Sequence, residues 1–269
     1  MPKTRLDTLL VDRGHAPSRE KARAIIMSGV VFLNNQRIDK PGTMVAEDAN
    51  PEVRGAVMPY VSRGGLKLEK ALDTFGVDVT DKCCIDCGAS TGGFTDCLLK
   101  RGARFVYAVD VGYGQLDWKL RQDPRVKVFE RTNIRHLTSE SLEEAPSLAV
   151  IDVSFISLRI VLPAVHALLT EDGQVIALVK PQFEAGKEHV GKKGVIRDPD
   201  VHKAVLEQFL QDATDAGFGV LALDFSPITG PEGNIEYLAY LQKAGNHVEA
   251  LNWETLVDES HEVLKGSTR

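Results

Sequence analysis

Residues 85–95 of the chain read Ile85-Asp86-Cys87-Gly88-Ala89-Ser90-Thr91-Gly92-Gly93-Phe94-Thr95, and this stretch decides the fold. It follows a short apolar run and opens a segment with helical spacing, so we expect a glycine-rich turn from a strand into a helix. Such a turn presents backbone N–H groups to a ligand at the carboxyl edge of a parallel sheet. The glycines leave no Cβ where the ligand must approach the chain. A tight turn that holds no ligand is the alternative.

On both sides of this turn, short apolar runs alternate with segments of helical periodicity. Runs such as Phe105–Val109 and Leu148–Ile151 are apolar throughout, as in parallel strands that are covered on both faces. We therefore predict one doubly wound α/β domain, a Rossmann-like sheet of seven strands. The expected strands lie near 82–87, 104–110, 126–129, 148–152, 173–179, 218–225 and 235–241. The main expected helices lie at 66–75, 93–101, 158–169 and 200–216.

The first 60 residues have a different pattern and a different charge. Leucines and isoleucines at helical spacing predict two short helices, and Asn34-Asn35 lies between two short apolar runs as in a tight hairpin. Residues 1–40 hold eight basic and four acidic side chains, a net +4, in a chain whose total is −6. We therefore expect a small α+β domain over 1–60, including a linker, and a larger domain over 61–269.

Composition excludes several classes of protein. No apolar run approaches the roughly 20 residues of a membrane helix, and the N-terminus lacks the apolar core of a signal peptide. We therefore expect a cytoplasmic protein with no membrane partner. Four cysteines are too few for a disulfide framework. Cys84-x-x-Cys87 has no second pair and no nearby histidine, so packing explains it better than a metal site, and we expect no metal.

Two cofactors suit the glycine-rich turn, a dinucleotide or S-adenosylmethionine. Asp110 ends the next expected strand, 24 residues after Asp86, where a carboxylate accepts both hydroxyls of an adenosine ribose. The third position of the dinucleotide fingerprint G-x-G-x-x-G is Ser90 instead of glycine, and its side chain crowds the place of a pyrophosphate. Asp86 repels phosphates but favours the sulfonium and amino groups of S-adenosylmethionine. A nicotinamide-dependent oxidoreductase is therefore the weaker alternative.

Polar residues also stand where three other expected strands meet their loops. Asp152 follows Leu148–Ile151, Lys180 follows Ile176–Val179, and Glu236 lies in the last apolar run. Because the carboxyl ends of parallel strands share one edge, Asp152 and Lys180 should lie near the glycine-rich turn. Lys67 lies on the helix before the sheet and taken alone indicates only a solvated lysine. Surface charge or a structural ion pair is the plain alternative for each of these residues.

These residues resemble a known family. Lys67, Asp152, Lys180 and Glu236 look like the Lys-Asp-Lys-Glu tetrad of FtsJ-type RNA 2′-O-methyltransferases, and residues 86–95 are similar to that family's cofactor loop. The stretch from Arg5 to Gly42 looks like an S4 RNA-binding domain, with Asn34-Asn35 where that domain usually has Asn-Gly. The two modules in this order resemble the TlyA family, which are ribosomal RNA cytidine 2′-O-methyltransferases also called haemolysins.

The resemblance implies a function and a set of site residues. S-adenosylmethionine would lie against Gly88, Ser90, Gly92 and Asp110, beside Asp86, and Asn133 is a further candidate to face the adenine. Lys180 would take the proton of the ribose 2′-hydroxyl, Asp152 would orient it, and Lys67 and Glu236 would position the ribose. Phosphate contacts to ribosomal RNA are expected from Lys3, Arg5, Arg19, Lys21 and Arg23.

Two other functions remain as alternatives. A membrane-active haemolysin finds no support in a chain without an apolar span or a strongly amphipathic basic helix outside the first domain. An RNA-binding adaptor with an inactive methyltransferase fold is disfavoured by the complete set of four charged residues. The target nucleotide, the ribosomal subunit and the oligomeric state do not follow from the sequence.

Overall fold

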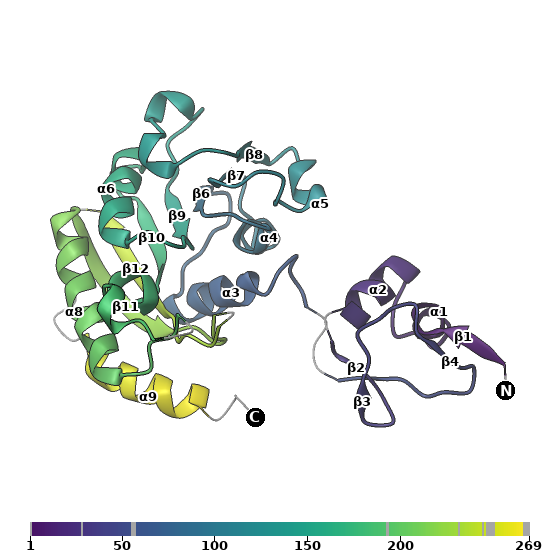
Figure 1. The fold of residues 1–269 in the computed structure, drawn as a ribbon. Helices are drawn as coiled ribbons and strands as arrows, with labels where there is room; N and C mark the ends of the chain where they lie inside the picture. The colour runs from purple at the N-terminus through teal and green to yellow at the C-terminus, as the bar shows by residue number, and fades with distance from the viewer. Residues whose placement is uncertain are drawn as a thin grey trace. The chain divides into compact units, whose positions relative to one another are not determined.

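The computed structural model describes residues 2–27, 29–54, 58–191, 194–230, 232–243, 245 and 251–265. The chain divides into two compact units, Met1–Pro59 and Tyr60–Arg269. Figure 1 shows the first unit in purple and the second in blue to yellow.

The N-terminal unit packs two short helices against short strands. The expected hairpin is present, and its turn residues Asn34 and Asn35 have φ values of 51° and 64°, which asparagine tolerates better than most residues. A small core is formed by the apolar faces of both helices, including Leu6, Leu10 and Ile26, which are fully buried. The elements are β1 (Lys3–Arg5), α1 (Leu6–Asp12), α2 (Arg19–Met27), β2 (Val31–Leu33), β3 (Gln36–Arg37), β4 (Met44–Ala46) and β5 (Glu52–Val53).

The second unit alternates strands and helices, as expected for a doubly wound fold. Its strands are β6 (Cys83–Cys87), β7 (Phe105–Val109), β8 (Val126–Phe129), β9 (Leu148–Ile151), β10 (Gln174–Val179), β11 (Phe218–Phe225) and β12 (Tyr237–Lys243). Its α-helices are α3 (Gly64–Phe75), α4 (Gly93–Lys100), α5 (Trp118–Arg121), α6 (Leu158–Leu168), α7 (Pro181–Glu184), α8 (Pro199–Asp215) and α9 (Trp253–Lys265). Short 3₁₀ turns lie at Ile134–His136, Ser139–Ser141 and Lys187–His189.

The seven strands form one sheet in the order β11-β12-β10-β9-β6-β7-β8. The five strands from β10 to β8 run parallel, whereas β12 is antiparallel to both β10 and β11. The predicted α/β fold with a seven-stranded sheet and a small N-terminal α+β domain is confirmed. The apolar pattern of the sequence does not show that β12 is antiparallel to β10. This direction determines at which end of the sheet Glu236 lies.

Each face of the sheet is covered by its own apolar core. Along β6, Cys83, Ile85 and Cys87 face one core, which also includes apolar side chains of α6, α8 and α9. Cys84 faces the other core, which contains apolar side chains of α3 and α4. This two-sided burial explains the continuous apolar runs in the sequence.

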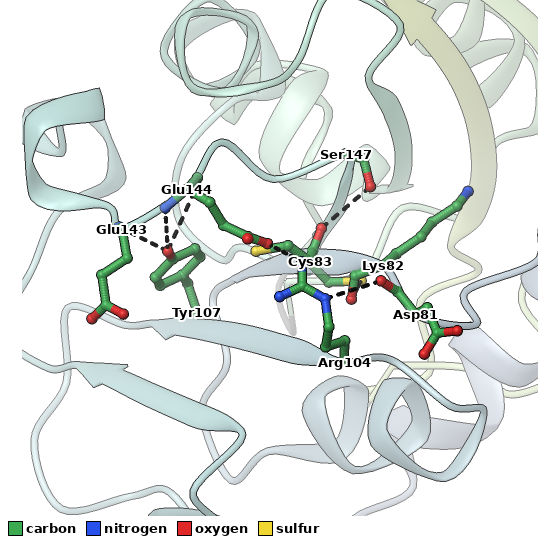
Figure 2. Close-up of polar contacts among 9 residues, drawn as sticks. Asp81, Lys82, Cys83, Arg104, Tyr107, Glu143, Glu144 and Ser147 are labelled. Carbon is green, nitrogen blue, oxygen red and sulfur yellow. Dashed lines mark hydrogen bonds and ion pairs between the residues drawn. The ribbon is translucent and has the colours of Figure 1, made fainter.

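At the amino end of the central strands, a buried tyrosine anchors the segment that leads into β9 (Figure 2). The hydroxyl oxygen of Tyr107 accepts hydrogen bonds from the amides of Glu143 and Glu144, at 2.9 and 3.1 Å. Arg104 forms an ion pair with Glu144, at 2.5 Å. These contacts fix the edge of the sheet that lies opposite the glycine-rich turn.

Candidate active site

Lys67 and Glu236 form a buried ion pair. Lys67 lies in the first part of α3, and Glu236 directly precedes β12. The Lys67 Nζ atom lies 2.5 Å from Oε2 of Glu236, and the two side chains are only 7% and 2% exposed. A charge removed from water is tolerated when a partner compensates it, so each side chain depends on the other.

Asp152 and Lys180 form a second pair. Asp152 directly follows β9 and Lys180 directly follows β10. The Lys180 Nζ atom lies 2.5 Å from Asp152 Oδ1, and it donates to the carbonyl oxygen of Val153 at 2.9 Å and to the hydroxyl of Ser154 at 3.2 Å. The Lys180 amino group is therefore held by three oxygens.

The sheet topology brings both pairs to one edge. β9 and β10 are parallel neighbours, so Asp152 and Lys180 leave the sheet on the same side. Glu236 directly precedes β12, whereas the expected strand 235–241 included it. Because β12 is antiparallel to β10, and Tyr237 is paired with Val179, the start of β12 lies beside the end of β10. Glu236 thus reaches the same edge from the opposite chain direction.

All four charged side chains line one cavity of about 650 Å³. Its wall also includes Gly88 and Ser90 of the glycine-rich turn and Asn234. The buried Asn234 side chain accepts a hydrogen bond from the amide of Ile196 and donates one to the carbonyl of Gly194, at 3.1 and 2.9 Å. The cavity therefore combines the two ion pairs with the turn that we expected to bind a cofactor.

The glycine-rich turn has the backbone that its sequence requires. Gly88 and Gly92 have φ values of +88° and +95°, and a Cβ on Gly88 would lie 2.6 Å from the carbonyl oxygen of Asp152. Ser90 also has a positive φ, 48°. The carboxylate of Asp110 accepts a hydrogen bond from the Ser90 amide at 2.8 Å, so it supports the turn from the neighbouring strand. The turn is a preformed cradle with little room for side chains at its closest point.

Asp86 is a completely buried carboxyl group in β6, two residues before Gly88, and it is not among the residues that line the cavity. One of its oxygens accepts the hydroxyl of Thr95 at 2.6 Å, and the other has no hydrogen-bond partner among the described residues. Burial raises the pKa of Asp86 to about 7, and the negative charge of Asp152 adds to this effect. A buried acceptor of this kind suits a cationic group of a ligand better than a phosphate.

Asn133 has a structural role in the described chain. Its side-chain oxygen accepts a hydrogen bond from the amide of Arg135 at 3.1 Å and so caps the 3₁₀ turn Ile134–His136. Among the described residues, Asn133 does not line the cavity that holds the four charged side chains. Its assignment to the adenine stays a prediction.

Phe155 is a further candidate site residue, which the sequence pattern alone does not indicate. It lies three residues after Asp152, is 91% exposed and has a φ of +64°, which is rare for a bulky side chain. Its ring centroid lies 5.0 Å from that of Phe183, and both rings line the cavity. The available signal was a large aromatic residue in the short loop after Asp152, directly after Ser154.

The basic residues of the N-terminal unit divide into two groups. Arg5 and Arg19 both contact the fully buried carboxylate of Asp7, at 2.8 and 3.3 Å. The Arg5 guanidinium lowers the pKa of Asp7 to about 2. All five residues are exposed, but Arg5 and Arg19 have part of their charge engaged by Asp7. The five residues therefore differ in how freely their charges face solvent.

Neither metal nor disulfide chemistry is indicated in the described part of the chain. No group of three or more histidine, cysteine or acidic side chains there is arranged to hold a metal ion. The four cysteines are free and buried, and burial raises the pKa of the Cys84 thiol to about 12. Cys84 and Cys87 pack on opposite faces of the sheet, as two residues of a core strand.

Comparison with known families agrees with the two units. Residues 60–243 match the model of the FtsJ-like methyltransferases, and residues 4–50 match the model of the S4 domain. The fold and the cavity therefore define an FtsJ-like methyltransferase unit that follows an S4 domain.

Comparisons over the whole chain show to which family of FtsJ-like methyltransferases the protein belongs. YqxC of Bacillus subtilis is 53% identical over 269 residues, which cover 98% of this chain and 96% of that protein. The 16S/23S rRNA (cytidine-2′-O)-methyltransferase TlyA of Mycobacterium tuberculosis is 43% identical over 263 residues, 97% of each chain. A solved structure from Streptococcus thermophilus, whose name includes the word hemolysin, is 48% identical with a TM-score of 0.79, covering 99% of this chain and 98% of its own. The chain belongs to the TlyA family.

Proposed function

We propose that this protein transfers a methyl group from S-adenosylmethionine to the ribose 2′-oxygen of a cytidine in ribosomal RNA. The observation that carries the proposal is the convergence of Lys67, Asp152, Lys180 and Glu236 in one cavity beside the glycine-rich turn. A full-length relationship supports the substrate class, since the Mycobacterium tuberculosis relative is named for this reaction. The S4 domain that precedes the cavity-bearing unit of this chain is consistent with an RNA substrate.

The residues at the turn fit S-adenosylmethionine. A cradle without side chains at Gly88 lies over the carbonyl of Asp152, and the unpartnered oxygen of Asp86 suits a cationic group. Gly88, Ser90 and Gly92 would contact the cofactor through their backbone, and Asp110 would accept ribose hydroxyls while it supports the Ser90 amide. When bound, the cofactor supplies an electrophilic methyl group on a positively charged sulfur.

Lys180 is the proposed proton acceptor. A ribose hydroxyl must lose its proton as its oxygen attacks, and a lysine accepts that proton only in its neutral form. Asp152, the Val153 carbonyl and Ser154 surround the Lys180 amino group and fix its position. Positioning of this kind contributes to the rate independently of the proton transfer.

Lys67 and Glu236 are proposed to hold the ribose. They form a pair of a hydrogen-bond donor and an acceptor at the wall of the cavity, which suits the vicinal hydroxyl groups of a sugar. The exposed ring of Phe155, next to Phe183, offers a flat surface on which an unstacked base would lie. Lys67 and Glu236 would thus hold the sugar at one part of the cavity wall, and the two aromatic rings would hold the base at another.

The name of the Streptococcus thermophilus structure includes the word hemolysin, but no structural feature of the described residues favours a membrane-active protein. Among the described residues, every helix is too short or too polar to cross a bilayer. We propose that the protein works on ribosomal subunits in the cytoplasm, with RNA contacts from the N-terminal unit. Release of a dye from protein-free liposomes at nanomolar protein concentration would instead support membrane activity.

The direct test uses purified small and large ribosomal subunits from cells that lack the enzyme, with a donor that carries a tritiated methyl group. We expect label to enter the RNA of at least one subunit with the wild-type protein. The Lys180→Ala variant should lose about 10²- to 10⁴-fold in turnover, which is the usual contribution of a proton-transfer group, while its Kd for the donor changes less than threefold. If the wild-type protein labels the RNA of neither subunit, the proposed function is refuted. If Lys180→Ala turns over at the wild-type rate, the role of Lys180 is refuted.

A further inference from the structure

Two loop segments of the candidate active site contact one another at three places. The first segment is Asp152–Leu158, which connects β9 to α6, and the second is Lys180–Glu184, which contains α7. At the cavity, Lys180 contacts Asp152, Val153 and Ser154 as described above. The second point is the contact of the Phe155 and Phe183 rings, with centroids 5.0 Å apart.

The third point is the carboxylate of Glu184. One of its oxygens accepts a hydrogen bond from the hydroxyl of Ser157 at 2.6 Å, and the other accepts from the amide of Leu158 at 3.0 Å. Ser157 is the N-cap residue of α6, and its hydroxyl also accepts from the amide of Arg159 at 3.2 Å. Glu184 therefore fixes the end of the second segment to the start of α6.

Glu184 makes these contacts away from the reacting groups. Glu184 and Ser157 line a separate cavity of about 600 Å³, together with Asp212 and other side chains of α8. Neither residue is part of the wall of the catalytic cavity. An effect of Glu184 on catalysis would therefore have to pass through the two segments and not through contact with the substrate.

The surroundings of Glu184 disfavour the charged form of its side chain. Burial raises its pKa, the hydrogen bond from Ser157 opposes that rise, the charge of Asp212 adds to it, and Arg159 counteracts it. A half-buried carboxylate is favourable only when it receives good hydrogen bonds, and here both donors belong to the opposite segment. The first segment also contains Phe155 with its strained backbone, a conformation that persists only when its surroundings enforce it.

We propose that Glu184 is a positioning residue for methyl transfer, which holds the Asp152 segment and the Lys180 segment in register. This inference rests on the proposed function, because it assumes that the Asp152–Lys180 pair acts in the reaction. A displacement of about 1 Å in a catalytic group can cost on the order of 10²-fold in rate. Loss of the Glu184 contacts leaves the Asp152–Lys180 ion pair chemically intact but frees the two segments to move apart.

The test compares three variants of the full-length protein in the labelled-methyl assay. Glu184→Ala removes both contacts, and we expect kcat to fall 10- to 100-fold while the Kd for the donor changes less than threefold. Glu184→Gln keeps one acceptor and the same shape, so we expect a loss of no more than fivefold. Asp200→Ala is the matched control, because it removes another acidic side chain of the same second cavity. We expect Asp200→Ala to retain wild-type kcat.

A double-mutant cycle separates positioning from general destabilisation. If Glu184 acts through Ser157, the variant Ser157→Ala should lose at least threefold in kcat, and Glu184→Ala combined with Ser157→Ala should be no slower than Glu184→Ala alone. Wild-type kcat in a folded Glu184→Ala, or an equal loss in Asp200→Ala, overturns the inference. If Glu184→Ala does not fold, wild-type kcat in Ser157→Ala overturns it. Failure of the proposed function is distinct, since the wild-type protein would then transfer no label.

Discussion

At the scale of single residues, the two ion pairs of the cavity are the most informative feature of the molecule. Asp152 and Lys180 stand directly after apolar strands, so the sequence alone could place them at one edge of the sheet. Lys67 could not be separated from a solvated lysine, because its significance comes from Glu236, 169 positions away in the chain. Contacts of that kind are fixed by topology and not by local pattern.

The Lys67–Glu236 pair yields a prediction about stability. Lys67→Met should lower the free energy of unfolding by about 3–5 kcal/mol at pH 7, because it leaves the Glu236 carboxylate buried without a partner. Lys67→Met combined with Glu236→Gln should recover a large part of that loss, although both variants should be inactive. Urea unfolding followed by circular dichroism measures both values. A loss below about 1 kcal/mol in the single variant would mean that Glu236 is not held as a buried ion.

Asp7 yields a prediction about pH in the N-terminal unit. Its pKa is lowered to about 2 by Arg5, so its stabilising contribution is complete above the ordinary aspartate pKa near 4 and is lost as the pH falls toward 2. We expect α1 of the wild-type protein to exchange its amide hydrogens more slowly than α1 of Asp7→Asn at pH 5. The difference should shrink steadily between pH 4 and pH 2.

Hydrogen–deuterium exchange of the full-length protein, with both proteins measured at equal pH, checks this prediction. Comparison at equal pH removes the intrinsic pH dependence of exchange. A protection difference for α1 that stays constant down to pH 2 would show that the Asp7 charge does not stabilise this unit.

At the scale of elements, the turn from β6 into α4 is the part that the sequence predicted most completely. Its glycines, the strand before it and the helix after it are local features, and each one is present in the structure. The direction of β12 was not predictable, because an apolar strand has the same pattern in both directions. The very short strands β1, β4 and β5 also carried no clear signal, since two or three residues cannot show a period of two.

Gly88 allows a direct test of the turn. Gly88→Ala places a Cβ 2.6 Å from the Asp152 carbonyl oxygen at a φ of +88°, so the backbone must shift or carry strain of about 1–3 kcal/mol. We expect the Kd for S-adenosylmethionine to rise at least tenfold by isothermal titration calorimetry. The variant Gly76→Ala is a suitable control, because it has a similar strain, φ +64°, at the end of α3 with no atom close to the added Cβ. Equal donor affinity in wild-type and Gly88→Ala proteins would contradict a cofactor site at this turn.

At the scale of the whole molecule, a basic N-terminal unit is joined to an acidic unit that carries the cavity. The uneven charge was readable from composition, but the division of the basic residues was not. The buried Asp7 engages Arg5 and Arg19, and this pairing depends on how α1 and α2 pack. Lys3, Lys21 and Arg23 are therefore the better candidates among the five for direct phosphate contacts.

This division predicts the salt dependence of RNA binding. In the full-length protein, replacing Lys3, Lys21 and Arg23 by alanine should weaken binding to ribosomal RNA and reduce the slope of log K against log salt by about 2 to 3, close to one per lost phosphate contact. Arg19→Ala should reduce the slope by less than one, because its charge is partly used by Asp7. Filter binding from 50 to 300 mM KCl measures both slopes. An unchanged slope in the triple variant would place the RNA contacts elsewhere.

We expect the cavity that is lined by the two ion pairs and the glycine-rich turn to methylate a ribose and not a base. The most direct measurement is mass spectrometry of nucleosides from ribosomal RNA that has been incubated with S-adenosylmethionine and the purified protein. We expect 2′-O-methylcytidine as the new nucleoside, formed by the wild-type protein and formed at least about 100-fold more slowly by Lys180→Ala. A methyl group on a base, or none on any nucleoside, would contradict this expectation.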